Sequence, residues 1–234
     1  MTGLQTPQVT DWLEGDFQQS ELLENAQQEK IQGVCFAACM YWILHHKNYR
    51  TGTIFTKKST TDVRLEFLTK KQTFLSICGV QSKLETTRSK DMSVFDHEMQ
   101  FIGDYNLVTV GQPTSAYLGG LSKYYIRDDV NMVEIFGNKT EALSTFVNKK
   151  HTYHIVNMDG SMPHTICVYK SGGGVFSAAH LYAFDPNRGE FKVPEASIND
   201  FFPMLLAKYL SMDMKFSQLV AQQVTTGNGT VNLN

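Results

Sequence analysis

Four cysteines and seven histidines are the side chains of this sequence best suited to nucleophilic catalysis. Cys35 follows Gly33 and Val34 at the expected start of an apolar helix. Unpaired backbone N–H groups and the helix dipole at such a start favour a thiolate, which is the nucleophilic form of cysteine. The position therefore suits a nucleophile, although cysteine is also among the residues most often buried as a small hydrophobe.

His164 is the histidine best placed to act as a base for this thiol. It opens an expected strand after a Gly-Ser-Met-Pro turn, and Asp185 closes the next expected strand. Adjacent antiparallel strands would bring the two side chains together, so that the carboxylate fixes the imidazole tautomer and stabilises its charged form. Cys35 precedes His164 by roughly 130 residues, which is close to the separation in papain-type enzymes. Order and spacing together predict a Cys-His-Asp triad.

The other histidines have explanations that need no catalysis. His154 shares a strand with apolar neighbours and is expected to pack among them. His180 lies five residues before Asp185 on one expected strand, so the alternation of side chains places the two on opposite faces. His45 and His46 close the early helix, where the dipole favours cationic residues. None of these four histidines is a good triad candidate.

A tetrahedral intermediate at Cys35 would need two hydrogen-bond donors aimed at its oxyanion. The backbone N–H of Cys35 is one donor by position. Papain-like enzymes add a side-chain amide a few residues upstream, and here Gln28 and Gln32 compete for that role, with Gln27 also open. Loop length favours Gln28, but a plain surface glutamine explains each of these positions without a catalytic role.

Three sequence blocks resemble the conserved blocks of the YopT/AvrPphB cysteine proteases, which are effector enzymes of pathogenic bacteria with a papain-like fold. The blocks are GVCFAACMYWI, MPHTICVYK and AFDPNRGEF, and the D-P-N-x-G-E-F string is the most specific of them. The resemblance implies that Cys35, His164 and Asp185 form the catalytic triad.

The resemblance also implies a reaction and a setting. A thiol-dependent endopeptidase would cut a host or target protein through a thioester acyl-enzyme, with small GTPases and kinases as candidate substrates. The protein would be a bacterial virulence effector or toxin, secreted without a Sec signal peptide and delivered to the cytosol of a host or target cell.

Two other functions are compatible with the same residues. A Cys-His-Asp site could deamidate glutamine, transglutaminate or transfer an acyl group on a protein substrate. Alternatively, a papain-like scaffold could bind a partner without turnover. All three residue types of the triad are present, whereas a degenerate enzyme usually loses one, and this favours an enzyme over a scaffold.

Composition and charge exclude several classes of function. The 234 residues are 42% hydrophobic, which is enough for a core, and a formal net charge of -2 does not indicate nucleic-acid binding. The remaining cysteines, Cys39, Cys78 and Cys167, are expected to be buried thiols, because four irregularly spaced cysteines do not make a disulfide framework. No zinc-ligand spacing occurs, so neither a metal nor a cofactor is expected. The chain is expected to be a monomer.

Neither a membrane span nor a Sec signal peptide can be recognised in the sequence. No apolar run reaches the roughly 18 to 20 residues of a membrane span. The first twenty residues lack the basic and apolar regions of a Sec signal peptide, so the protein is expected to stay in the cytosol or leave it by another route. Lys57, Lys58, Lys70 and Lys71 could meet an acidic partner or membrane headgroups, but solvated helix faces explain them as well.

The elements that must position the triad are helical early in the chain and β-rich later. After the helix that starts near Gly33, further helices are expected at about Thr61–Leu75, Asp91–Ile102, Lys139–Asn148 and Ile198–Leu210. Strands are expected at His151–Met158, His164–Lys170, Val175–Phe184 and Glu190–Val193. This pattern predicts an α+β, papain-like fold in which an N-terminal helical part carrying the cysteine helix packs on a C-terminal twisted antiparallel sheet.

The same pattern predicts the domain organisation. Residues 1–30 form a polar lead-in, and residues 31–216 form a single papain-like catalytic domain. Within it, a helical subdomain covers about 31–150 and a sheet subdomain about 151–216, and residues 217–234 are expected to be a flexible tail.

Overall fold

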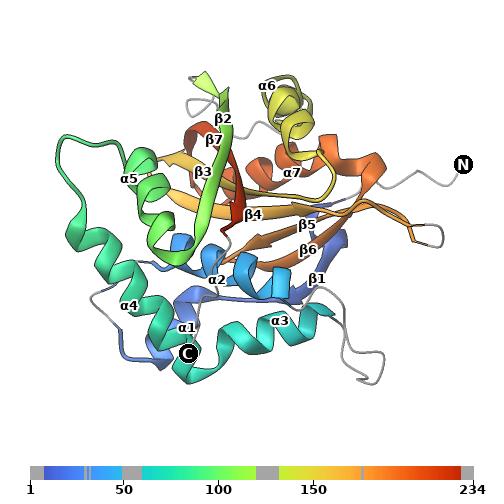
Figure 1. The fold of residues 1–234 in the computed structure, drawn as a ribbon. Helices are drawn as coiled ribbons and strands as arrows, with labels where there is room; N and C mark the ends of the chain where they lie inside the picture. Colours follow the sequence, from blue (N-terminus) through green and yellow to red (C-terminus); the bar gives the residue numbers. More distant parts are fainter. Residues whose placement is uncertain are drawn as a thin grey trace, which may run out of the picture.

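An antiparallel sheet of seven strands organises the computed structural model of the chain, in the strand order β1-β6-β5-β4-β3-β7-β2 (Figure 1). The structure describes residues 8–28, 31, 33–48, 60–119, 132–174 and 177–227. The strands are β1 (Leu13–Asp16), β2 (Leu107–Tyr117), β3 (Thr152–Gly160), β4 (His164–Lys170), β5 (His180–Asp185), β6 (Gly189–Pro194) and β7 (Phe216–Thr226).

Helices cover both faces of this sheet (Figure 1). One face carries α1 (Gln19–Asn25), α2 (Cys35–Asn48), α3 (Thr60–Thr69), α4 (Lys71–Thr87) and α5 (Val94–Phe101), and the other carries α6 (Met132–Val147) and α7 (Ile198–Leu210). Short 3-10 turns lie at Val9–Trp12, Ile102–Tyr105 and Glu195–Ser197. The two layers give two apolar cores, one on each side of the sheet. The expected α+β class is confirmed.

The central helix is α2, and its sequence explains its place. Residues from Phe36 to Leu44 are apolar on every side of the helix, and all of them are buried. A helix without a polar face is stable only when it is surrounded by protein, and α2 lies between β4 and the helices α3 and α4. The helix thereby holds Cys35, its first residue, at a fixed point beside the sheet.

Several predicted elements coincide with the structure. β4 and α7 have the predicted bounds, and the predicted strand Val175–Phe184 is observed as β5 from His180, with Val175 and Phe176 outside the described residues. The predicted helix Thr61–Leu75 is instead two helices, α3 and α4, which meet at Lys70.

The prediction of a flexible tail over residues 217–234 is wrong for its first part, while residues 228–234 lie outside the described residues. Phe216–Thr226 forms β7 in the interior of the sheet, between β3 and β2, and Leu219 and Ala221 are fully buried there. The segment is polar enough to suggest a tail, but its backbone finds hydrogen-bond partners on two strands that lie far away in sequence. The sheet also takes β1 from the expected lead-in and β2 from the expected helical part.

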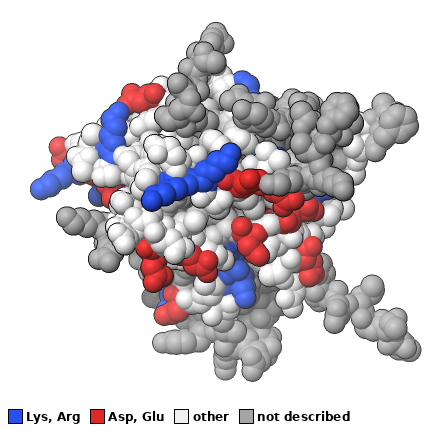
Figure 2. Space-filling model, turned by 90° about the horizontal axis from the view of Figure 1, so that it is seen from below, with Lys and Arg blue, Asp and Glu red and all other residues white. Residues whose placement is uncertain are grey.

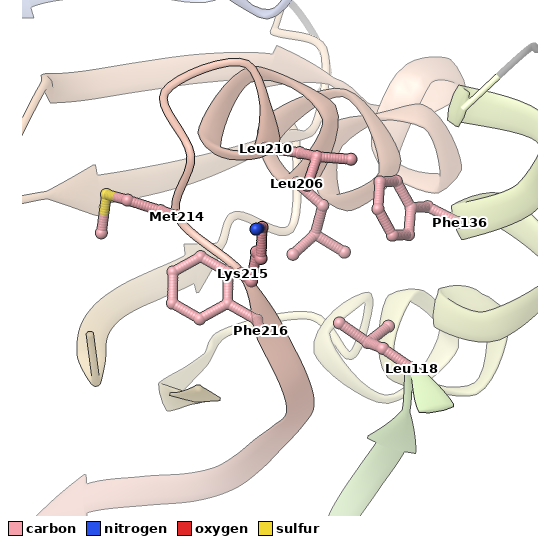
Figure 3. Close-up of a pocket in the computed structure, with 7 residues that line it drawn as sticks. All are labelled: Leu118, Phe136, Leu206, Leu210, Met214, Lys215 and Phe216. Atoms are coloured by element: carbon pink, nitrogen blue, oxygen red, sulfur yellow. The ribbon is translucent and has the colours of Figure 1, made fainter. Parts of the chain in front are cut away.

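The cavity that the described residues leave between α6, α7 and β7 is too small for a ligand. Figure 3 shows the small apolar cavity between these helices and β7, lined by Leu118, Phe136, Leu206, Leu210, Met214, Lys215 and Phe216. Its volume of about 10 Å³ is at most that of one water molecule. Chemistry must therefore be sought elsewhere.

The surface carries charges of both signs. On the face seen from below, acidic and basic side chains are interspersed, as Figure 2 shows. Such a mixture does not create the single-sign field that steers a nucleic acid. Among the described residues, no helix has the length and apolar character needed to cross a membrane.

Candidate active site

The first turn of α2 presents Cys35 to one edge of the sheet. The preceding Val34 N–H donates to the side-chain oxygen of Gln19 at 2.7 Å, and the Ala37 N–H donates to Gln81 at 3.3 Å. The N–H of Cys35 lies in the same turn, where no helical acceptor is available, so it can serve as an oxyanion donor. Cys35 is partly exposed, whereas the other three cysteines are buried.

His164 and Asp185 meet at the same edge, on neighbouring strands. The Nε2 atom of His164 lies 2.8 Å from Oδ1 of Asp185, and both side chains are almost fully buried. β4 pairs with β5 in antiparallel register, so the start of one strand lies beside the end of the other. This contact leaves Nδ1 of His164 as the ring nitrogen that can serve the thiol.

Charge coupling links the three side chains. Burial raises the pKa of the Cys35 thiol, but hydrogen bonding and positive charge from His164, together with hydrogen bonds at Thr165, outweigh it, so the pKa lies below its ordinary value. Burial lowers the pKa of His164, whereas the Asp185 carboxylate and the Cys35 thiolate raise it more, to about 10. A thiolate beside an imidazolium is the form of this site that can attack a carbonyl carbon.

The Asp185 carboxylate is held by three donors. Besides His164, it accepts from the backbone N–H of Asn187 at 2.9 Å and from the hydroxyl of Tyr209 at 2.7 Å. Burial raises the pKa of Asp185, but the charge of His164 and these hydrogen bonds more than reverse this, so the pKa is lowered. The carboxylate therefore stays ionised and fixes the orientation of the imidazole.

Tyr209 is a contact that sequence reasoning did not identify. It lies near the end of α7, fully buried, and its ring packs 5.6 Å from that of His164. The helix was predicted, but its periodicity only marks Tyr209 as a core residue. Its hydroxyl acquires a role only because the tertiary fold brings it to Asp185.

Gln19 is a second residue that sequence reasoning missed. This buried side chain begins α1, and while its oxygen accepts from Val34, its Nε2 donates to the side-chain oxygen of Asn187. The backbone N–H of Gln19 also donates to the carbonyl of Pro186 at 2.9 Å. One amide thus joins the residue before the thiol to the turn after Asp185. The sequence contains no signal for this, because Gln19 lies outside all three motif blocks.

Of the two glutamines predicted for the oxyanion hole, the structure describes Gln28. Gln28 is half-buried, and its amide nitrogen donates to the chain's own Ala26 carbonyl at 3.3 Å. Gln32 lies outside the described residues. The side-chain amide of Gln28 is therefore directed at the backbone of its own loop.

A buried carboxyl, Glu98, lies on the side of Cys35 formed by α5 and β3. It accepts a hydrogen bond from the amide of Asn157, which pairs across the sheet with Thr165. Burial raises the pKa of Glu98 to about 8, and the nearby Cys35 and Asp159 charges contribute. A group of this kind is neutral at pH 7, so it does not oppose the thiolate there.

The remaining histidines lie away from this constellation. His154 is fully buried, with its ring 5.0 Å from that of Phe146, and burial lowers its pKa to about 3. His45 and His46 lie at the far end of α2, and His180 lies at the opposite end of β5 from Asp185. Burial, together with the charges of Arg64 and Lys70, lowers the pKa of His45 to about 4, so this residue is not the cation that the sequence suggested at the end of the helix.

Comparisons with known proteins give a family match and structural neighbours. The family model Peptidase_C58, described as Yersinia/Haemophilus virulence surface antigen, matches residues 15–224. The crystal structure of the Pseudomonas avirulence protein AvrPphB matches with a TM-score of 0.65 at 14% sequence identity, over 93% of this chain and 100% of that chain. That likeness confirms the expected papain-like fold.

A second structural match is more distant. PatoxP, a cysteine protease-like domain of the Photorhabdus asymbiotica toxin PaTox, gives a TM-score of 0.43 at 11% identity, over 94% of this chain and 56% of that chain. No protein of curated function matches by sequence.

Proposed function

The chain belongs to the Yersinia/Haemophilus virulence surface antigen family of cysteine peptidases, Peptidase_C58, and on this basis we propose that it is a thiol-dependent endopeptidase acting through Cys35, His164 and Asp185. One observation carries the proposal. The thiol of the half-buried residue Cys35 has a lowered pKa and lies beside a buried imidazole that is itself held by a carboxylate. Cysteine nucleophiles require this combination of thiolate, proton carrier and orienting group.

The proposed reaction follows from these groups. The Cys35 thiolate attacks the carbonyl carbon of a peptide bond, and the resulting oxyanion accepts a hydrogen bond from the Cys35 N–H. The His164 imidazolium gives its proton to the amine as the C–N bond breaks, which leaves a thioester. The neutral imidazole then takes a proton from water as the water attacks the thioester. This step releases the carboxylic acid and restores the ion pair.

Asp185 and Gln19 would act on this cycle through position. Asp185 keeps His164 in the tautomer that directs Nδ1 to the thiol, and the pairing of charges stabilises the imidazolium. Gln19 ties the residue before Cys35 to the turn that follows Asp185. Small displacements between a nucleophile and its base are costly, so this tie supports the proposed geometry.

We further propose a protein substrate from a host or target cell. Small GTPases and kinases are the first candidates, because the sequence blocks around the three residues resemble those of effector proteases. On the same ground, the proposed setting is the cytosol of a host or target cell, which the protein reaches as a secreted effector.

Alkylation by iodoacetamide tests the proposed site without a known substrate. Purified protein is treated across a pH series, and peptide mass mapping follows each cysteine. We expect Cys35 to react at a pH where Cys78 and Cys167 do not, and we expect His164→Ala to remove this selectivity. Equal rates at the three cysteines would refute the activated thiol.

A second measurement separates proteolysis from other acyl transfers. Candidate substrates are incubated with the protein, and their intact masses are recorded. Cleavage supports the endopeptidase, whereas a gain of about one dalton or a larger adduct would assign deamidation or transfer to the same thiol.

A further inference from the structure

A second, open cleft lies at the opposite ends of the elements that carry the three site residues. Its volume is about 680 Å³, within the usual range for small-ligand sites. It is lined by His46 near the end of α2, Ser171 just beyond β4, and His180 at the start of β5. Along α2 alone it is separated from Cys35 by roughly 16 Å.

Tyr169, Tyr182 and Lys192 line one wall of this cleft and belong to a longer row of side chains on the sheet. Strand register pairs Tyr153 with Tyr169, Tyr169 with Tyr182, and Tyr182 with Lys192, so the four side chains share one face of the sheet. The rings of Tyr169 and Tyr182 stack with their centroids 6.4 Å apart. We call these four residues the tyrosine row. Tyr182 is half-exposed, and the Arg64 guanidinium lies over its ring 5.9 Å from the centroid, so a ligand can reach the exposed part of this ring.

Histidine rings extend this wall. The His46 ring lies 4.6 Å from Tyr169, and the His180 ring lies 6.2 Å from Tyr182. His151, which also lines the cleft, is exposed. A planar ring entering here would meet aromatic faces, which favour offset stacking.

The charge of the lining is positive. None of the described residues that line the cleft carries a carboxyl group, whereas Arg64 and Lys192 are cationic. Arg64 is buried and already paired with Glu190. Lys192 is half-buried and has no hydrogen-bond or ion-pair partner within the described part of the chain, so its charge is available to a ligand.

Two further carboxylates lie near the rim and do not remove this charge. Glu195 is paired with Lys170 at 2.9 Å, and its carboxylate also interacts with His180. Glu14, on the edge strand β1, is exposed and interacts with Tyr182. Water screens an exposed carboxylate strongly, so Glu14 weakens but does not cancel the field of Lys192.

We propose that this cleft binds a small anion that carries a planar ring, of the chemical class of nucleoside monophosphates. The ring stacks on Tyr182 and His180, and the phosphate pairs with Lys192. A hydrogen bond from Ser177, which also lines the cleft, can complete the phosphate site. The proposal does not depend on the proposed peptidase activity.

Calorimetric titration at pH 7 with three probes tests this site. Adenosine 5′-monophosphate carries both features, whereas adenosine lacks the phosphate and ribose 5-phosphate lacks the ring. We expect the monophosphate to bind at least about tenfold more tightly than either fragment. Equal affinity for the monophosphate and either fragment, or no binding of the monophosphate, would overturn the proposal.

Two variants assign the contacts. Lys192→Gln should weaken the monophosphate about tenfold, as expected for loss of a charge-assisted hydrogen bond, and leave adenosine unaffected. Tyr182→Leu should weaken the monophosphate and adenosine but not ribose 5-phosphate. Lys208→Gln, at an exposed position of α7 on the other side of the sheet, is the matched control. The proposal fails if Lys192→Gln binds as tightly as this control.

A measurement on the unmodified protein keeps the test independent of variant folding. Lysines are acetylated with a water-soluble acyl reagent, and peptide mass mapping follows each site. Adenosine 5′-monophosphate should slow acetylation of Lys192 at least about fivefold, because the bound phosphate pairs with the ammonium group of Lys192 and shields it from the reagent. The acetylation rate of Lys208 should not change. Equal protection of the two lysines, or none, would contradict the site.

Discussion

The two ends of α2, β4 and β5 contain similar residue types but differ in how those residues are paired. At one end, His164 is buried and bonded to Asp185, and Cys35 lies beside it. At the other end, His180 is half-buried beside Tyr182, in a cleft whose described lining has no carboxyl group. The first end concentrates proton-transfer groups, and the second presents rings and an available cation.

This difference shows that residue type alone does not determine chemistry. An imidazole becomes a base or acid for a thiol when burial and a carboxylate control its proton, as they do for His164. His180 lies instead in an open cleft, where its Nδ1 is 3.0 Å from the Ala178 carbonyl oxygen and the carboxylate that it interacts with, Glu195, is exposed, so it lacks the buried carboxylate that controls the proton of His164. Between the two ends, the buried row Ile155, Cys167, Phe184 and Glu190 separates the sites.

The largest effect is expected from removal of the proposed nucleophile. Cys35→Ala should lower cleavage at least about a thousandfold, because the other three thiols of the chain are buried and Cys35 is the one beside His164. It should leave binding of adenosine 5′-monophosphate intact, since the cleft lies at the other end of α2. New peptide N-termini in a eukaryotic cell lysate and calorimetry measure the two effects. Cys78→Ala, which removes a buried thiol on α4, is the control.

If Cys35→Ala also abolished nucleotide binding, the two ends would be one site. If it left cleavage at the level of Cys78→Ala, the proposed nucleophile would be wrong.

The next effect concerns the carboxylate that distinguishes the two ends. Asp185→Asn should slow cleavage about a hundredfold or more, because the imidazole loses its tautomer and the charge that stabilises its protonated form. In the unmodified protein, cleavage should persist until the pH rises through about 10, where His164 loses its proton. The variant should lose cleavage at lower pH, since the raised pKa of His164 depends on Asp185.

The same variant should move Cys35 alkylation in the opposite direction. Less positive charge on His164 raises the pKa of the thiol, so alkylation should begin at higher pH than in the unmodified protein. Unchanged pH profiles for both reactions would show that Asp185 does not control the pair.

A smaller effect is expected from the amide that joins the two loops of the proposed active site. Gln19→Leu removes the hydrogen bonds to Val34 and Asn187, and it should slow Cys35 alkylation about tenfold through displacement of the thiol from His164. Gln222→Leu is the matched control, because this buried glutamine of β7 bonds only backbone carbonyls of β2 and β7.

Gln19→Glu keeps the acceptor for Val34 and loses the donor to Asn187, so it separates the two contacts. If Gln19→Leu and Gln222→Leu slow alkylation equally, Gln19 contributes to the stability of the fold and does not position Cys35.

The smallest effect is expected from Glu98, the other buried carboxyl near Cys35. Folding raises the pKa of this carboxyl, so between its unfolded and its folded pKa the native state binds a proton that the unfolded state has lost. The free energy of unfolding therefore falls as the pH rises through this range. The unmodified protein should therefore lose thermal stability relative to Glu98→Gln between about pH 4.5 and about pH 8, and the difference should stay constant above that range.

Melting temperatures across this pH range measure the difference. Glu141→Gln, at an exposed position of α6, controls for the substitution itself. A constant difference from pH 4.5 to pH 8 would show that Glu98 does not titrate in this window.

Local sequence determined the pieces that hold the proposed active site. The turn before His164 and the turn after Asp185 set the ends of β4 and β5, and the expected antiparallel pairing of these strands indicated that the two side chains approach each other. The all-round apolar pattern after Gly33 predicted the buried helix. These features depend on neighbours within a few residues, so a single sequence contains them.

Only the tertiary structure decided which distant residues complete each end of the molecule. Tyr209 and Gln19 reach Asp185 and Val34 through packing of α7 and α1, and no local pattern records such contacts. The tyrosine row exists only in the register of four strands. β7 was hidden for the same reason, because its backbone hydrogen-bond partners lie on β2 and β3, which are far away in sequence.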